Sequence, residues 1–371
     1  MNNLLLQFIN DPAVSVHFTP AQWDVLIPQA RNSFLLATLY RMLEERDLLD
    51  QIPLPPRHHL FSGVVTHDRQ MLSLDYEIKW MLRAVSALKV PLVLLKGSAY
   101  LQAQLPAAGG RLISDIDLMV PESQINAVEA AFNEAGWLGG HADDYDERYY
   151  REWMHEIPPL SHIDRGSTLD VHHTIIPPTA NPNTDADKLF AAAREIRPGL
   201  LVLAPVDMII HSATHLFHEG DFNHGFRDVL DLDRLLRHFA DTEPGFWDEL
   251  VPRAIELDLL QSLFYGLRYS HKIFGTPIPS QVLAQSYEAV SVKLLVPLMD
   301  YLFMRVLAPN HFSCARRFDG MARFCLYVRS HYLRMPMGLL ILHLGRKAWK
   351  RRFTKEVDVE DPEYAEDGEK A

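Results

Sequence analysis

Two aspartates separated by one residue open an apolar segment, in Arg111-Leu-Ile-Ser-Asp-Ile-Asp-Leu-Met-Val120. Alternate side chains of a strand share a face, so Asp115 and Asp117 would point to the same side. Two carboxylates at one edge of a sheet offer the oxygen ligands that Mg²⁺ prefers, together with substrate phosphates and water. This spacing therefore indicates a site for a divalent metal ion.

A second short motif, Leu94-Leu-Lys-Gly-Ser98, precedes these aspartates. It follows an apolar run and opens a possible helix, so its backbone N–H groups and the positive helix end would favour phosphate. The other Asp-x-Asp pairs of the chain lie in polar loops or on a helix, where solvated turns and caps are typical. Context therefore selects Asp115 and Asp117 as half of a metal–triphosphate site.

Together the two motifs resemble those of the nucleotidyltransferase superfamily, which includes DNA polymerase β and the aminoglycoside nucleotidyltransferases. They look most like a bacterial family of uncharacterised nucleotidyltransferases, and the resemblance covers residues 90–236. It implies transfer of a nucleoside monophosphate from an NTP such as ATP to an acceptor hydroxyl, with release of pyrophosphate. The acceptor stays open among a small molecule, a sugar phosphate, a protein side chain and an RNA end.

By this resemblance, three carboxylates would bind two Mg²⁺ or Mn²⁺ ions. Asp115 and Asp117 are two of them, and the third is expected at Asp170, between two apolar residues of a strand, with Asp164 as the alternative. Asp170 would also take the proton of the acceptor hydroxyl, while the metals stabilise the attacking and leaving oxygens.

The resemblance also assigns the phosphate contacts. Gly97 and Ser98 would hold the β- and γ-phosphates, and Lys96 or Arg111 would neutralise phosphate charge, with a surface ion pair as the alternative for each. One departure from the superfamily pattern is a longer interval between Gly97 and the aspartates, which a turn at 107–110 absorbs.

Histidines form two further groups. His172 and His173 would point to opposite faces of their strand, so one of them could face the site. Three others share one face of an expected helix: His211, His215 and His218. That spacing can hold Zn²⁺, but the chain has no His-Glu-x-x-His there, and packed or hydrogen-bonded histidines are the alternative.

A third interpretation of this helical segment comes from the resemblance. The histidine-bearing helix and the next helix would close over the nucleotide, with Arg227 and Asp231 lining the cleft. The alternative for Asp231 is an ion pair with Arg227 or Arg234 on its own helix.

Helices flank an α/β middle in the expected fold. Apolar spacing predicts helices over 4–50, 67–88 and 121–136, and strands over 90–95, 116–120, 156–163 and 168–174. From 185 to 353 the pattern is almost wholly helical. We therefore expect an α/β (α+β) fold, a small mixed nucleotidyltransferase-type sheet embedded in a mostly helical chain. Its expected regions are N-terminal helices (1–88), a catalytic core (89–180), C-terminal helices (181–355) and an acidic disordered tail (356–371).

Composition excludes several classes of protein. The net charge of −12 over 371 residues excludes a broadly basic surface that coats nucleic acid. Two cysteines exclude a disulfide framework. With no secretory signal and no apolar run near the ~20 residues of a membrane span, we expect a cytoplasmic protein. Residues 337–353, apolar and then basic, could contact a membrane surface or nucleic acid, or form a docked C-terminal helix.

Two other functions compete with nucleotidyl transfer. A non-catalytic nucleotide-binding or interaction module with this fold would be expected to have lost part of its carboxylate set, which is present here. A zinc-dependent hydrolase would use the helix histidines.

Overall fold

The computed structural model describes residues 3–140, 153–291 and 293–334. These ranges contain a seven-stranded sheet in the order β3-β4-β5-β2-β1-β7-β6. The strands are β1 (Leu92–Leu94), β2 (Ile116–Met119), β3 (Trp137–Gly139), β4 (Leu160–His162), β5 (Thr168–His172), β6 (Arg194–Arg197) and β7 (Leu200–Val202). β2 is parallel to β5 and β1 is parallel to β7, whereas the other neighbours are antiparallel. The sheet is mixed, which confirms the predicted fold class.

The centre of the sheet is buried on both faces. Every residue of β1 and β2 is buried, which explains why both segments have nearly continuous apolar sequences. Two short helices pack against the sheet, α5 (Lys96–Gln102) on β2 and α6 (Ile125–Glu134) on β3. The predicted order of strand, Gly-Ser helix and Asp-x-Asp strand is therefore present in the structure.

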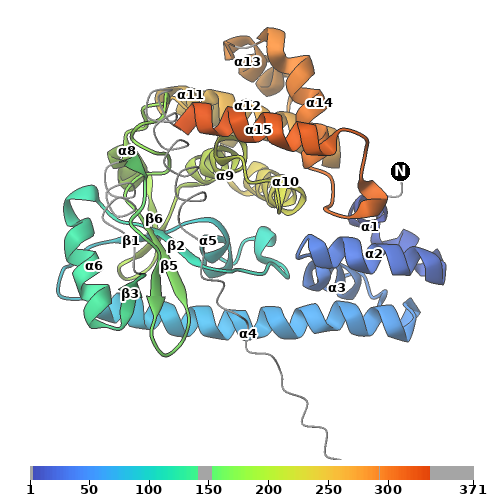
Figure 1. Ribbon diagram of the computed structural model, residues 1–371, viewed down its shortest axis with the longest axis horizontal. Helices are drawn as coiled ribbons and strands as arrows, with labels where there is room; N and C mark the ends of the chain where they lie inside the picture. The colour runs from blue at the N-terminus through green and yellow to red at the C-terminus, as the bar shows by residue number, and fades with distance from the viewer. Residues whose placement is uncertain (1–2, 141–152, 292, 335–371) are drawn as a thin grey trace, which may run out of the picture.

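Four helices precede the sheet: α1 (Leu4–Asn10), α2 (Pro20–Asn32), α3 (Leu36–Glu44) and α4 (Leu54–Ala84). Figure 1 shows α4 running along one side of the molecule, past the sheet at one end and past α2 and α3 at the other. It begins before residue 67, where the sequence predicts a helix to start, inside a proline-rich segment. Pro55 and Pro56 fall in its first turn, where the missing N–H costs no hydrogen bond.

The prediction of almost wholly helical structure after residue 185 is wrong at β6 and β7. Gly199 has a positive φ of 77°, so the Pro198-Gly199 turn reverses the chain and Leu200–Val202 pairs with β1. The sheet thus extends past residue 180, where the expected core ends.

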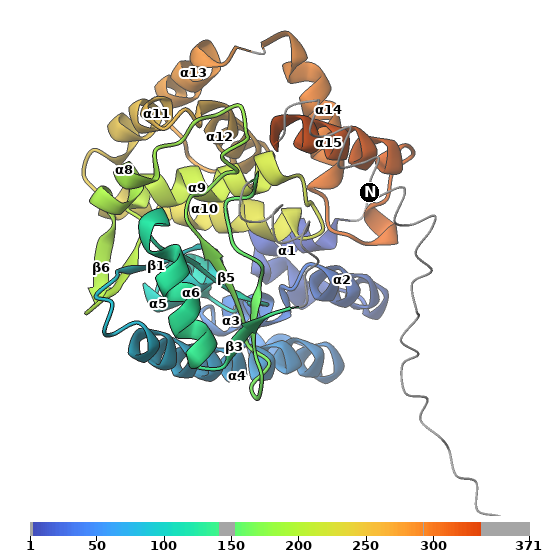
Figure 2. The same ribbon diagram turned by 60° about the vertical axis from the view of Figure 1, so that its left-hand side comes forward.

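Eight helices follow in the described part of the chain: α8 (Ala186–Ala192), α9 (Pro205–Glu219), α10 (Gly225–Thr242), α11 (Phe246–Glu256), α12 (Leu260–Phe274), α13 (Ser280–Ala289), α14 (Val296–Val306) and α15 (Asp319–Arg334). α9 and α10 lie beside each other near the centre of the molecule (Figure 2). A Cβ on Gly266 of α12 would lie only 2.8 Å from the Cβ of Ala213, so the glycine lets α12 approach α9 closely.

Two predicted C-terminal features, the basic segment 337–353 and the acidic tail 356–371, lie outside the described residues. Among the helices within the described ranges, none combines the length and apolar character that crossing a bilayer requires.

Candidate functional site

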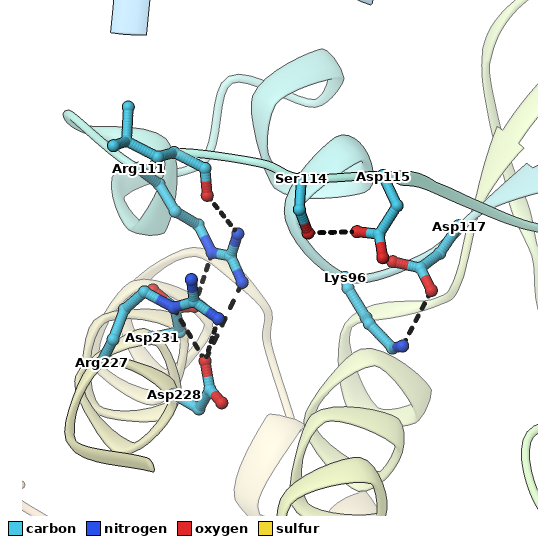
Figure 3. A network of polar contacts seen from close by, with 9 residues as sticks. Lys96, Arg111, Ser114, Asp115, Asp117, Arg227, Asp228 and Asp231 are labelled. Atoms are coloured by element: carbon cyan, nitrogen blue, oxygen red, sulfur yellow. Dashed lines mark hydrogen bonds and ion pairs between the residues drawn. The ribbon is translucent and has the colours of Figure 1, made fainter. Parts of the chain in front are cut away.

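A cavity of about 310 Å³ lies between the sheet and the helices α9 and α10. Its lining is mostly polar: Lys96, Gly97, Tyr100, Arg111, Leu112, Ile113, Ser114, Asp115, Asp117, Ser212, His215, Asp221, His224, Arg227, Asp228 and Asp231. Figure 3 shows two charged groups, one from β2, the residues before it and the start of α5, and the other from Arg111 and α10. The cavity therefore has an acidic wall with one lysine and a second wall of paired arginines and aspartates.

The acidic wall contains the predicted carboxylates. Asp115 and Asp117 line the cavity, and Asp170 of β5 is the direct register partner of Asp117 on the parallel strand β2. The Oδ1 atom of Asp170 is buried and makes no hydrogen bond. Ser114 Oγ donates to Asp115 Oδ1 at 2.8 Å. The structure thus places Asp117 and Asp170 on adjacent strands, with Asp115 directly before β2.

The two register partners have opposite electrostatic environments. Burial raises the pKa of Asp170 to about 7, and the negative charges of Asp117 and Asp115 act in the same direction. Burial also acts to raise the pKa of Asp117, but the Lys96 ammonium and the His172 ring outweigh it and hold that pKa well below its usual range. Asp117 is therefore a stable carboxylate, whereas Asp170 titrates near neutrality.

Lys96 and His172 meet at one oxygen of Asp117. Lys96 Nζ lies 2.8 Å from Asp117 Oδ1, and His172 Nε2 lies 3.3 Å from the same atom. Burial lowers the pKa of His172 to about 4, so its ring is neutral at physiological pH. His173 points to the other face, where its Nε2 lies 3.1 Å from the carbonyl oxygen of Met154. Of the two adjacent histidines, His172 faces the carboxylates.

Gly97 and Ser98 differ from each other in their relation to the cavity. A Cβ at Gly97 would collide with the Arg111 guanidinium and with Ile113, so any larger residue there would displace the Arg111 side chain. Ser98 is buried, does not line the cavity, and donates its hydroxyl hydrogen bond to Leu95 O at 2.8 Å. Because this hydroxyl is used within its own helical turn, the predicted phosphate contact of Ser98 would fall to its backbone N–H.

The arginine wall is held by ion pairs. Arg111 Nε donates to Asp231 Oδ2 at 2.7 Å, and Arg227 Nη2 donates to Asp228 Oδ1 at 2.9 Å. Asp231 therefore pairs with Arg111 from the loop before β2, not with Arg227 or Arg234 as the helical spacing suggested. Burial acts to lower the pKa of Arg111, but Asp231 and Asp228 outweigh it and raise that pKa, so the guanidinium stays charged.

The three histidines of α9 lie in different surroundings. His215 lines the cavity, His211 is buried, and His218 lines a different cavity of about 610 Å³. Within the described ranges, a set of three ligand atoms from His, Cys, Asp or Glu lying within 4.8 Å of one another occurs elsewhere, at His155, Glu156 and His172. Neither the helix histidines nor the three aspartates meet as closely as that.

Distant contacts hold the segment that precedes β2. The side-chain amide of Gln70 in α4 donates to Ile113 O at 2.7 Å and accepts from Ile113 N at 3.0 Å. Thr38 Oγ1 donates to Gly109 O at 3.1 Å. These positioning residues have no local signal in the sequence, because they lie far from the motif along the chain.

Sequence reasoning also missed cavity residues, among them Tyr100, His224 and Asp228. Asp228 could have been found, because it stands three residues before Asp231 and so shares its helical face. Asp164, the alternative third carboxylate, lies in the exposed turn between β4 and β5.

Comparisons with known proteins agree with this description. No curated protein and no solved structure matches the chain. The model of a family described as uncharacterised nucleotidyltransferase matches residues 19–275, a range that contains all the strands described above and all the residues that line the cavity. The resemblance inferred from the motifs is confirmed, and nucleotidyl transfer is the general reaction type that this family's description names. The chain belongs to the uncharacterised nucleotidyltransferase family.

Proposed function

We propose that this protein transfers a nucleoside monophosphate from an NTP to a hydroxyl group of an acceptor, with release of pyrophosphate, in a reaction that needs two Mg²⁺ or Mn²⁺ ions. The observation that carries the proposal is the position of Asp115 and Asp117 on the cavity wall, with Asp170 beside Asp117 on the parallel strand. A cavity of about 310 Å³ opposite two arginines suits the phosphates and sugar of a nucleotide.

The donor set fits divalent ions. Three carboxylates supply oxygen ligands, and the buried Oδ1 of Asp170 makes no hydrogen bond that a cation would have to break. A cation at Asp117 would compete with the Lys96 ammonium, which now lies 2.8 Å from that carboxylate. Bound metal would stabilise the charge that develops on the attacking and leaving oxygens.

The other residues act on the phosphates and on the acceptor. Lys96, once displaced from Asp117, together with Arg111 and Arg227 supplies positive charge at the cavity wall. Gly97, which has no side chain, lets the Arg111 guanidinium lie against the backbone at the cavity wall. The Asp170 carboxylate takes the proton of the acceptor hydroxyl as that oxygen attacks the α-phosphorus.

The test measures transfer of label from each α-labelled NTP into fractions of cell lysate, with Mg²⁺ or Mn²⁺. We expect the wild type to transfer label and the variants Asp115→Asn and Asp117→Asn to lose activity at least about 100-fold. Metal-dependent NTP binding, measured by calorimetry, provides a second readout that needs no acceptor.

The matched control is Asp164→Asn, which removes one carboxylate in an exposed turn away from the cavity. This variant should retain transfer. NTP binding that depends on the aspartates, without transfer to any fraction, would instead favour a non-catalytic nucleotide-binding module. NTP binding unchanged in both aspartate variants would contradict the proposed site.

A further inference from the structure

A second group of potential metal ligands lies behind Asp117. His155, Glu156 and His172 each offer one ligand atom, and these three atoms lie within 4.8 Å of one another. Two imidazoles and one carboxylate form the protein ligand set of several catalytic zinc sites, in which water or substrate completes the shell. This group shares no residue with Asp115, Asp117 and Asp170.

The spacing of two of these ligands already suits zinc. His172 Nδ1 lies 3.4 Å from Glu156 Oε2. Ligands about 2.0–2.1 Å from a common Zn²⁺ would subtend an angle of about 110° across that distance, which is the tetrahedral value. His155 offers the third ligand atom, within 4.8 Å of the other two, and its ring centroid lies 5.1 Å from that of His172.

His172 has one ring nitrogen toward Asp117 and the other toward Glu156. Its Nε2 faces the Asp117 carboxylate, which favours the tautomer with the proton on Nε2. In that tautomer, Nδ1 presents a lone pair toward a carboxylate oxygen of Glu156. Nδ1 is buried and makes no hydrogen bond.

Asp117 supplies the outer-shell partner that such a site requires. Metal-binding histidines commonly donate their other ring N–H to a carboxylate, which fixes the tautomer and the orientation of the ring. His172 Nε2 at 3.3 Å from Asp117 Oδ1 has this arrangement. One imidazole ring would therefore link the ion to a carboxylate of the cavity wall.

The backbone holds the ligands in place before any ion binds. Glu156 and His172 form an antiparallel bridge, so their side chains start from opposite positions on one face. Ile157 N donates to Val171 O at 3.0 Å, and His173 N donates to His155 O at 2.9 Å. Glu156 retains 20% of its side-chain exposure, which leaves the ion a path from solvent.

We propose that His155, Glu156 and His172 bind one divalent transition-metal ion of the Zn²⁺ class, and that this ion fixes His172 against Asp117. The proposal is independent of nucleotidyl transfer, because its ligands and its readout are separate from those of the NTP site.

The experiment titrates the chelator-treated full-length protein with Zn²⁺ by calorimetry, and with Co²⁺ as a spectroscopic probe. We expect one ion per chain and the visible absorption of four-coordinate Co²⁺. Glu156→Gln, isosteric and partly exposed, and His155→Ala should each weaken binding at least about 100-fold. Asp117→Asn should weaken binding roughly 10–100-fold, as loss of an outer-shell partner does.

Two controls make the result specific. His58→Ala removes an exposed histidine of α4 and should bind Zn²⁺ like the wild type. Asp115→Asn should also retain the ion, even though it is expected to lose nucleotidyl transfer, so a failure of either proposal can be recognised separately. Absence of stoichiometric Zn²⁺ binding, or binding unchanged in both Glu156→Gln and His155→Ala variants that remain folded by circular dichroism, would overturn the inference.

Discussion

Asp170→Asn should stabilise the protein while it removes a proposed ligand and base. The carboxylate of Asp170 is buried beside the charges of Asp117 and Asp115, and its pKa rises from the ordinary value of 3.8 to about 7. A carboxyl group with a raised pKa in the folded state binds protons more tightly there than in the unfolded chain. Folding stability is therefore lost as pH rises from about 4 to about 7, and the loss is complete above that range.

The size of the effect follows from this pKa. One pKa unit corresponds to about 1.4 kcal/mol, so the rise from 3.8 to about 7 sets an upper limit of about 4 kcal/mol. Partial exposure to solvent screens the charges and reduces the expected gain to about 1–3 kcal/mol at pH 8. At pH 5 the gain should be much smaller, because most Asp170 side chains are then protonated in the wild type.

Asp117→Asn is the matched comparison, because it makes the same change at the register partner and should have the opposite effect. Asp117 accepts a hydrogen bond from Lys96 at 2.8 Å and lies 3.3 Å from His172 Nε2. Removing this carboxylate takes away the charge that accepts a hydrogen bond from the partly buried ammonium. We expect a loss of about 3 kcal/mol at pH 8.

The assay is urea unfolding of the wild type and both variants at pH 5 and pH 8, without divalent ions. Adding Mg²⁺ at pH 8 should then reduce the advantage of Asp170→Asn, because a bound cation neutralises the wild-type carboxylates. The reasoning is refuted if Asp170→Asn is no more stable than the wild type at pH 8, or if both variants shift stability in the same direction.

Three further substitutions distinguish residues that line the cavity from a residue that only stabilises the fold. Gly97→Ala should reduce NTP affinity roughly 10–100-fold by displacing Arg111, with the protein still folded. Calorimetry would measure the affinity, and an unchanged value would contradict a role for the close contact between Arg111 and Gly97. Arg111→Met should cost about 3–5 kcal/mol in urea unfolding, because it leaves Asp231 buried without its partner, and adding Asp231→Leu should recover part of the loss. Arg253→Met breaks the pair with the buried Asp207, at 2.7 Å, and should destabilise the protein by about 3 kcal/mol while NTP affinity stays at the wild-type value.

The parts of the fold that could be predicted are determined by residues that lie close together in the sequence. Apolar neighbours mark the segments around Asp117 and Asp170 as strands, whereas the expectation that the two aspartates share a site came from the family resemblance. The Pro198-Gly199 turn could have indicated a hairpin, but three- and four-residue strands are too short for a clear period.

The parts of the site that could not be predicted depend on contacts between distant segments. Helical spacing offered Arg227 and Arg234 as partners of Asp231, whereas tertiary packing brings in Arg111. Ser98 is expected to hold phosphate, but the sequence does not show that its hydroxyl donates to Leu95 O within its own helical turn. Side-chain direction in a tight turn is decided by such local competition, which residue type alone does not reveal.

Because these contacts join segments that are far apart in the sequence, they limit when the cavity can form during translation. Arg111 bonds to an aspartate 120 residues further along, and Ile113 is held by a glutamine 43 residues earlier. During translation, α4 and the Asp-x-Asp strand can meet early, since domains fold as their segments emerge from the ribosome. The arginine wall, however, cannot form until α10 has left the exit tunnel. The nascent chain therefore lacks this wall until α10 has emerged, and premature termination before Asp231 would leave Arg111 without this partner.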